Sequence, residues 1–376
     1  MKERSGIRKE ILKNIRSIVV KVGTGVLCGT DGLLSRKGID RIVSDIAAVH
    51  RKGRQVVLVT SGAIGAGLGE LGWSRRPTQM AKLQAAAAVG QCALMQEYVA
   101  AFKKEGLICA QVLLTNEDLK SRSRYLNIRK TLQTLLAQGV VPVVNENDTV
   151  STQEIQFGDN DRLSALVTQL LGASLLILLS DVDGLLRRDE GGPVRVGLVE
   201  SIDRDAEACV WEKSSALGTG GMKTKLLAAR MVTRAGEAMV IANGRTPEIL
   251  QKILQGDNIG TLFLPKTGKM AGKKRWIAHF VTPRGRLMLD DGACKALREG
   301  HKSLLPTGIR KIAGDFSDGD TVSVCGLDGE EFGRGIVRYA SHDLSRILGK
   351  KTQEIFEVLG KKTPDEVIHR DNLVIL

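Results

Sequence analysis

Short apolar runs and longer amphipathic stretches alternate along most of the chain. From about residue 16 to residue 264, runs rich in β-branched and aliphatic residues are separated by segments whose apolar positions recur at helical spacing. This alternation is typical of βα units on a mostly parallel sheet. The predicted strands are Ser17 to Lys21, Gln55 to Thr60, Ile108 to Leu114, Val140 to Asn145, Leu175 to Ser180, Ala238 to Ala242 and Thr261 to Leu264.

Five of the longer segments are predicted to be helices. They are Ser35 to Lys52, Thr78 to Glu105, Asn116 to Gln138, Asn160 to Leu171 and Met222 to Ala235. A glycine immediately follows each one, at the position where a helix commonly ends in a left-handed residue. Several of the strands are uninterrupted apolar runs, as expected of strands that are covered on both faces. We therefore predict an α/β fold with a mostly parallel central sheet.

The pattern changes near the basic, glycine-containing stretch from Lys266 to Arg275. Beyond it, short strands and glycine turns dominate to about residue 340. A length of 376 residues also favours two domains over one. We predict a first domain over 14–265, a linker over 266–275 and a small β-rich domain over 276–365.

The composition is that of a globular protein with an aliphatic core. Hydrophobic residues make up 43% of the chain and charged residues 26%, whereas aromatic residues make up only 3%. The six cysteines form no CxxC pair and have no histidine at zinc-ligand spacing, which predicts reduced thiols. The charged start of the chain and the lack of long apolar runs predict neither a signal peptide nor a membrane span. We expect a cytoplasmic protein.

The net charge of +13 would suit either a nucleic acid or an anionic substrate. The excess of Lys and Arg is spread over both predicted domains. Such a spread favours a solvated surface over a dedicated basic patch.

Candidate chemistry gathers where the predicted strands end, which is where open parallel sheets bind their ligands. The first strand ends at Lys21, and Gly23 and Gly25 beyond it would let the backbone approach a phosphate. An ordinary surface lysine in a turn is the alternative. The second strand leads through small residues, Thr60 to Gly67, into a helix whose free N–H groups could hold an anion.

The glycines Gly67, Gly69 and Gly72 form a GxGxxG pattern, which is also found in dinucleotide-binding folds. They begin seven residues past the strand rather than at its turn, and no acidic residue lies about 20 positions further on. We reject a dinucleotide site on these grounds.

Amide and carboxylate side chains cluster after the fourth strand and at the start of the following helix. Helix capping could account for Asp159 or Asn160. It does not easily account for the whole cluster, which can bind an ammonium group or a metal. The cluster consists of Asn145, Asn147, Asp148, Asn160 and Asp161.

Two further segments could bind a nucleotide. The fifth strand ends at Ser180 and Asp181, which could instead form an Asx turn. The glycine-rich segment from Gly218 to Lys225 contains two lysines at a helix start, but it lacks the Walker A spacing and could be a linker.

Lysines on glycine-rich turns, with an acidic cluster between them on an α/β sheet, favour phosphoryl transfer. This chemistry needs positive charge around the transferred group and little covalent participation by the protein. A carboxylate acceptor is already ionised at pH 7 and needs no protein base. The chain contains only five histidines, and none lies near these motifs.

The chain resembles the glutamate 5-kinases of the amino acid kinase superfamily over nearly its full length. The matching motifs are, in order, VVKVGT, VTSGAIGAG, VVPVVNENDTV, FGDNDRLSA, LLSDVDGL, LGTGGMKTK, KKRWI, SLLPTGI and HRDNL. The resemblance implies a three-layer sandwich that uses ATP to phosphorylate the side-chain carboxylate of L-glutamate. The products would be ADP and L-glutamyl 5-phosphate, in the first step of proline biosynthesis.

The resemblance also implies roles for the residues at matching positions. Lys21, Asp161 and Lys225 would be catalytic, with Asp161 orienting the two lysines. Ser61, Asp148 and Asn160 would bind glutamate. ATP would be bound by Lys21, Ser180, Asp181, Thr219, Gly220, Gly221, Met222, Lys223, Thr224 and Lys225. Mg²⁺ would accompany the nucleotide, and the motifs single out no protein ligand for it.

The second domain resembles a PUA domain, a small β-rich fold named from RNA-modifying enzymes. RNA binding by this copy does not follow from the kinase resemblance. The resemblance further implies a homo-oligomer, dimeric or tetrameric, and feedback inhibition by proline. Two alternatives stay open: a kinase for another carboxylate such as aspartate or acetylglutamate, and an RNA-binding or regulatory protein.

Overall fold

The protein has two compact units, Met1–Lys269 and Met270–Leu376. The computed structural model describes residues 2–29, 33–150, 160–189, 192–202, 221–266, 272–300, 302–350, 352–360 and 364–376. The predicted domain bounds, 14–265 and 276–365, remain a proposal. Residues 272–275 of the predicted linker belong to helix α12 (Gly272–His279).

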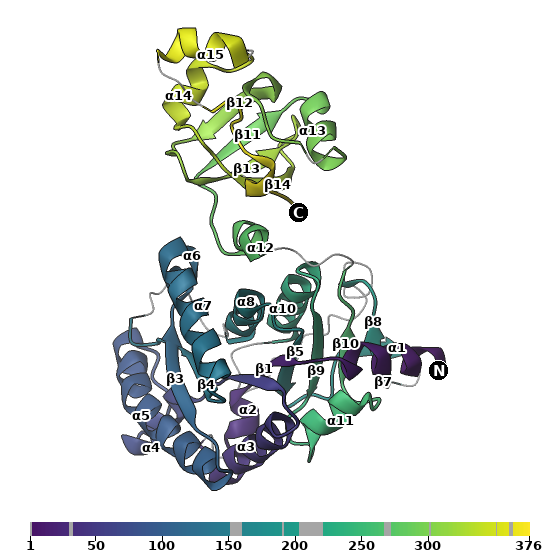
Figure 1. Cartoon of the computed structure of the whole chain (residues 1–376). Helices are drawn as coiled ribbons and strands as arrows, with labels where there is room; N and C mark the ends of the chain where they lie inside the picture. Colours follow the sequence, from purple (N-terminus) through teal and green to yellow (C-terminus); the bar gives the residue numbers. More distant parts are fainter. Residues whose placement is uncertain are drawn as a thin grey trace. The chain divides into compact units, whose positions relative to one another are not determined.

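The first unit is built on a mostly parallel sheet, as the alternating pattern predicted (Figure 1). Its order among the described residues is β3-β4-β2-β1-β5-β9-β10-β8, and the β9–β10 pair is antiparallel. A separate hairpin joins β6 (Leu186–Asp189) and β7 (Gly192–Arg195). The sheet strands are β1 (Ser17–Val22), β2 (Gln55–Val59), β3 (Cys109–Leu114), β4 (Val141–Glu146), β5 (Leu175–Ser180), β8 (Leu198–Val199), β9 (Ala238–Asn243) and β10 (Thr261–Phe263).

Helices cover both faces of this sheet and make a three-layer sandwich (Figure 1). All six residues of β5 are buried, which explains why its sequence is an unbroken apolar run. One face carries α3 (Arg36–His50), α5 (Met80–Lys104) and α11 (Ile249–Gln255), and the other carries α7 (Arg122–Ala137), α8 (Asn160–Leu171) and α10 (Met222–Arg234). The predicted α/β fold is confirmed.

The helices end just before the predicted glycines, but one segment that was predicted to be a single helix forms two. The glycines at 53, 106, 139, 172 and 236 have φ between 67° and 86°, the left-handed region that ends a helix. The predicted helix Asn116 to Gln138 is divided into α6 (Asn116–Lys120) and α7, because Ser121 between them has extended backbone with ψ 121°. Thr115 starts α6 with a capping box to Asp118.

The amino-terminal helix α1 (Lys2–Lys13) was not predicted. It packs on α11, and the buried guanidinium of Arg8 donates to the backbone carbonyls of Gly197 and Ile259. Because these carbonyls lie far away in sequence, no local pattern marks the helix as part of the fold. The short helix α2 (Thr24–Leu27) follows β1.

Helices α4 (Ala63–Glu70) and α5 cross with their backbones in direct contact. A Cβ atom on Gly67 would lie 1.8 Å from the carbonyl oxygen of Ala86, and one on Gly90 would lie 1.9 Å from that of Ala63. Neither position can hold a side chain without separating the helices. Gly67 and Gly90 therefore allow α4, which begins directly after Gly62, to pack closely against α5.

The second unit is a small β-rich domain. Its sheet has the order β12-β11-β13-β14-β15, with β11 and β13 parallel and the other pairs antiparallel. The elements are β11 (Gly285–Leu289), α13 (Asp291–Arg298), the 3₁₀ turn η1 (Pro306–Gly308), β12 (Ile309–Gly314), β13 (Thr321–Cys325), β14 (Glu331–Ile336), α14 (Ser341–Arg346), α15 (Thr352–Leu359), the 3₁₀ turn η2 (Arg370–Asn372) and β15 (Leu373–Ile375).

Helix α12 belongs to this second unit. Arg334 on β14 donates to the backbone carbonyl of Ala278 at 2.9 Å, and its guanidinium also pairs with Glu331. Ser323 on β13 donates to the same Glu331 carboxylate at 2.6 Å. This network ties the end of α12 to the sheet.

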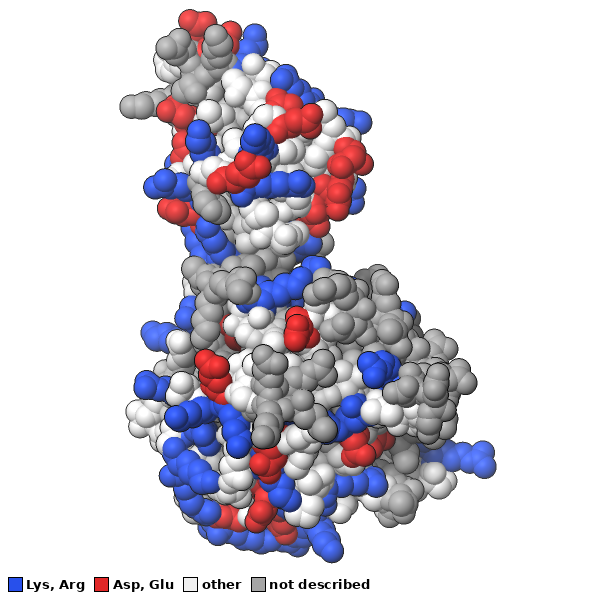
Figure 2. Space-filling view, turned by 90° about the vertical axis from the view of Figure 1, so that its right-hand side faces the viewer, with Lys and Arg blue, Asp and Glu red and all other residues white. Residues whose placement is uncertain are grey.

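Charged side chains of both signs are interspersed over the visible face of each unit (Figure 2). This view agrees with the even spread of charge along the sequence. No helix among the described residues is long and apolar enough to cross a membrane.

The glycine crossing gives the first testable prediction. Gly67→Ala should lower the free energy of unfolding by about 1–3 kcal/mol, because the added methyl group meets backbone rather than a movable side chain. Gly69→Ala, two positions along the same helix, is the matched control. Its Cβ would have the Leu33 side chain 3.4 Å away as its nearest neighbour, so we expect a change of less than about 1 kcal/mol, in the stabilising direction.

Urea unfolding followed by circular dichroism measures both variants. Equal stability of Gly67→Ala and Gly69→Ala would contradict the close approach of α4 and α5.

Candidate active site

The carboxyl ends of five neighbouring strands meet at one edge of the sheet. Strands β4, β2, β1, β5 and β9 are parallel. Lys21 is therefore in register with Val59 on one side and Leu178 on the other, and Ser180 is opposite Asn243. The predicted site residues at these strand ends therefore lie along the same edge.

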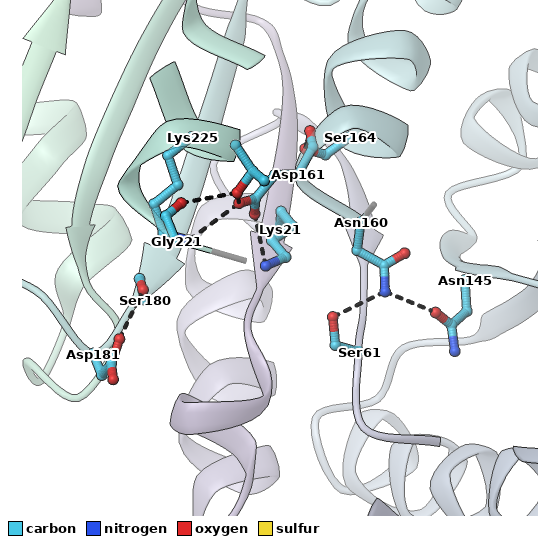
Figure 3. Close-up of polar contacts among 11 residues, drawn as sticks. Lys21, Ser61, Asn145, Asn160, Asp161, Ser164, Ser180, Asp181, Gly221 and Lys225 are labelled. Atoms are coloured by element: carbon cyan, nitrogen blue, oxygen red, sulfur yellow. Dashed lines mark hydrogen bonds and ion pairs between the residues drawn. The ribbon is translucent and has the colours of Figure 1, made fainter. Parts of the chain in front are cut away.

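Two buried lysines share one buried carboxylate at this edge (Figure 3). Lys21 Nζ lies 2.8 Å from Asp161 Oδ1, and Lys225 Nζ lies 3.1 Å from Asp161 Oδ2. Thr224 Oγ1 donates to Oδ2 as well, at 2.8 Å. Asp161 is 1% exposed, and its position in the first turn of α8 adds the favourable field of a helix N-terminus. The three charged groups come from β1, α8 and α10.

Burial and charge oppose each other in this cluster. Burial alone would raise the pKa of Asp161, but the charges of Lys21 and Lys225 and the hydrogen bonds from Lys21 and Thr224 outweigh it and hold the pKa below its usual range. The pKa of Lys21 is lowered, because burial and the nearby charge of Lys225 outweigh the attraction of Asp161. Two ammonium groups facing one carboxylate leave one positive charge in excess.

The turn after β1 lies beside the end of β5. Gly23 N donates to the Leu179 carbonyl at 3.0 Å, and a Cβ on Gly25 would lie 3.5 Å from the Asp181 carboxylate. Ser180 Oγ donates to Asp181 Oδ1 at 3.0 Å (Figure 3). On the other side of the turn, Arg245 donates to the Gly25 carbonyl at 2.9 Å. The two segments predicted to contact a nucleotide are thus neighbours.

A second, uncharged cluster lies where β2 and β4 end (Figure 3). Asn160 Nδ2 donates to Ser61 Oγ at 2.9 Å and to Asn145 Oδ1 at 3.2 Å. The other amide atom of Asn160, Oδ1, is buried and accepts no hydrogen bond from the described residues. Because Asn160 and Asp161 are adjacent at the start of α8, this helix end joins the uncharged cluster to the charged one.

Comparison with known proteins places this site in a family. The model of the amino acid kinase family matches residues 16–243, and the PUA domain model matches residues 285–359. The chain belongs to the amino acid kinase family. The glutamate 5-kinase of Pelobacter propionicus is 45% identical over 98% of this chain and 100% of its own length. Those of Geobacter sulfurreducens and Chromohalobacter salexigens are each 46% identical, over 98% and 100% of this chain and the whole of their own lengths. The resemblance seen in the motifs is confirmed.

The remaining predicted site residues of this amino acid kinase domain fall in two places. Asp148 lies in the turn after β4, where burial raises the pKa of its carboxyl group and the charge of Arg76 opposes the rise. At the start of α10, Gly221 is the N-cap, Met222 the first helical residue and Lys223 is exposed. The predicted ATP contacts Thr219 and Gly220 lie outside the described residues.

The structure adds contacts that the predicted site did not contain. Thr224 was assigned to the nucleotide, and its hydrogen bond to Asp161 was not expected. Asn145 was recognised as part of the polar cluster but not as a site residue, although it accepts from Asn160. A strand that ends in NEN, directly after an apolar run, is the signal that could have included it.

The shared carboxylate gives a stability prediction. Asp161→Asn should lower the free energy of unfolding by about 3–5 kcal/mol at neutral pH, because it leaves two buried ammonium groups without their counter-charge. Since the folded pKa of Asp161 is depressed, its stabilisation is complete above the unfolded pKa of about 4 and is lost as the pH falls through the lower folded value.

Urea unfolding of the wild type and of Asp161→Asn between pH 3 and pH 8 measures the gap between their free energies of unfolding. We expect a constant gap from about pH 5 upward and a narrowing gap below about pH 4. A gap that is the same at both ends of the range would contradict an ionised Asp161 as the source.

Proposed function

We propose that this protein transfers the γ-phosphoryl group of ATP to the side-chain carboxylate of L-glutamate. The products are ADP and L-glutamyl 5-phosphate, and the reaction is the first step of proline biosynthesis. The proposal is supported by full-length relatives named glutamate 5-kinase. The observation that carries the chemistry is the pair of buried lysines on one carboxylate.

Lys21 and Lys225 stabilise the negative charge that is shared between the transferred phosphoryl group and its neighbours. Phosphoryl transfer depends on such fixed charge more than on covalent catalysis. Asp161 holds both ammonium groups at short distance and prevents them from turning to solvent. The glutamate carboxylate is ionised at neutral pH and attacks without a protein base.

Glutamate is held by the uncharged cluster and by Asp148. The buried Oδ1 of Asn160 can accept from the substrate ammonium group, and Ser61 Oγ can donate to a carboxylate oxygen. Asp148 supplies a negative charge for the same ammonium group. The side-chain carboxylate of glutamate then points toward the ammonium groups of Lys21 and Lys225, because Asn160 is adjacent to Asp161, which holds both of them.

ATP is bound by Lys21, by the β5 end at Ser180 and Asp181, and by the segment 219–225. The backbone N–H groups at the start of α10 and the turn after β1 are suited to phosphate oxygens. Mg²⁺ in kinases is held mainly by phosphate oxygens and water with one or two carboxylates, and Asp181 can supply one. Bound Mg²⁺ would neutralise charge on the β- and γ-phosphates.

A trap for the acyl phosphate tests the reaction. Purified protein, ATP, Mg²⁺, glutamate and hydroxylamine should give the γ-glutamyl hydroxamate. The same assay with aspartate or acetylglutamate should give far less product. Salt-sensitive RNA binding without turnover of any of these substrates would instead favour an RNA-binding protein.

Lys21 and Lys225 are expected to affect kcat more than the stability of the fold. Lys21→Met and Lys225→Met should lower kcat on the order of 10²-fold or more, as removal of other electrostatic donors does. Lys130→Met, an exposed lysine on α7, is the control and should keep full activity. Variants that fold, bind ATP and retain kcat within about threefold would contradict the proposed role.

Regulation and assembly follow from the same proposal. We propose that the enzyme is a cytoplasmic homo-oligomer, dimeric or tetrameric, and that proline inhibits it at or overlapping the glutamate site. Added proline should then raise the KM for glutamate and leave the KM for ATP unchanged. Inhibition that high glutamate cannot overcome would contradict overlapping sites.

A further inference from the structure

A chain of amide hydrogen bonds continues from the uncharged cluster to helix α5. Asn145 Nδ2 donates to Gln91 Oε1 at 2.9 Å, and Gln91 Nε2 donates to Gln111 Oε1 on β3 at 3.4 Å. With Asn145 accepting from Asn160, the chain runs from Ser61 to Gln111. Each of its four side-chain amides could exchange the positions of its oxygen and its NH₂ group by rotating half a turn. A neighbouring group that can only donate or only accept must therefore decide which orientation each amide adopts.

The backbone N–H of Glu146 is that fixed element. It donates to Asn145 Oδ1 at 2.9 Å, and a backbone N–H can only donate. Asn145 therefore presents its oxygen to Glu146 and Asn160. Its NH₂ group must then face α5, where it requires an acceptor.

Gln91 is the acceptor. Asn145 is 2% exposed, so an unpaired NH₂ group there would lose its hydrogen bonds to water without replacement. With Gln91 in place, Asn145 Oδ1 receives the NH₂ group of Asn160, and Asn160 Oδ1 is turned away from Asn145. The unpartnered atom of Asn160 is therefore an acceptor rather than a donor.

We propose that Gln91 is a positioning residue for glutamate: it accepts from Asn145 and so holds the amide orientation that the Glu146 N–H selects, in which Asn160 Oδ1 is left free to accept from the substrate ammonium group. This inference rests on the proposed function. Gln91 itself contacts neither substrate nor nucleotide in this account. It acts on Asn160 through two hydrogen bonds, those of Asn145 with Gln91 and with Asn160.

Three full-length variants test the proposal. Gln91→Met keeps the length of the side chain and removes the acceptor. Gln91→Glu keeps an acceptor for Asn145, removes the donor to Gln111 and adds a negative charge. Gln96→Met, on an exposed position of the same helix, is the matched control.

Steady-state kinetics with the hydroxamate assay provide the readout. In Gln91→Met the KM for glutamate should rise about tenfold, as expected for one buried hydrogen bond, with the KM for ATP nearly unchanged. Gln91→Glu should restore the KM for glutamate to within about threefold of the wild-type value, and Gln96→Met should match the wild type.

The outcomes separate this inference from the proposed function. An active wild type with an unchanged glutamate KM in Gln91→Met overturns the role of Gln91 alone. Equal rises in both KM values, or failure of Gln91→Glu to restore the glutamate KM, would indicate a general packing role and also overturn it. A wild type without glutamate-dependent hydroxamate overturns the proposed function and this inference together.

Discussion

The buried Asp161 carboxylate is the constraint on which the charged half of the site depends. Two ammonium groups could not be buried side by side without it, because each would lose its hydration and repel the other. One carboxylate neutralises only one of the two charges. Taken alone, this cluster of three side chains therefore carries one excess positive charge, which suits the phosphate group of the proposed nucleotide. In the proposed mechanism, binding and stability depend on the same three side chains.

This arrangement requires elements that are distant in the chain to meet within about 3 Å. The parallel sheet brings Lys21 to the ligand edge, and α8 and α10 pack on one face of that sheet so that Asp161 and Lys225 reach the same point. On the other face, α4 and α5 pack with their backbones in direct contact, and Ser61 lies just before α4.

Features that depend on local sequence could be predicted, whereas contacts between distant segments could not. The strands could be predicted because strands that are buried on both faces are apolar throughout. The helix ends could be predicted because left-handed backbone favours glycine. The break at Ser121 was missed because the apolar spacing continues across it. Helix α1 was missed because its segment is mostly charged and its Arg8 contacts lie some 190 and 250 residues away.

The same distinction holds within the site. Lysines on glycine-rich turns and an acidic cluster pointed to phosphate chemistry, and the family resemblance then singled out Lys21, Asp161 and Lys225. The contact of Thr224 with Asp161 and that of Gln91 with Asn145 could not be predicted in this way, since each joins residues more than 50 positions apart. A glutamine in the middle of an amphipathic helix looks like any other polar residue until its partner is known.

The charged cluster and the uncharged cluster of the site rely on different interactions. Charge is long-ranged and tolerant of small displacements, which suits a phosphoryl group whose charge distribution changes during transfer. Amide hydrogen bonds are directional, and a buried amide facing the wrong way leaves a donor opposite a donor. Selection of an amino acid over a simple carboxylate needs that directionality. Because the orientation of the whole amide chain follows from one backbone N–H at the end of β4, the parallel sheet that positions the lysines also determines which way the amides point.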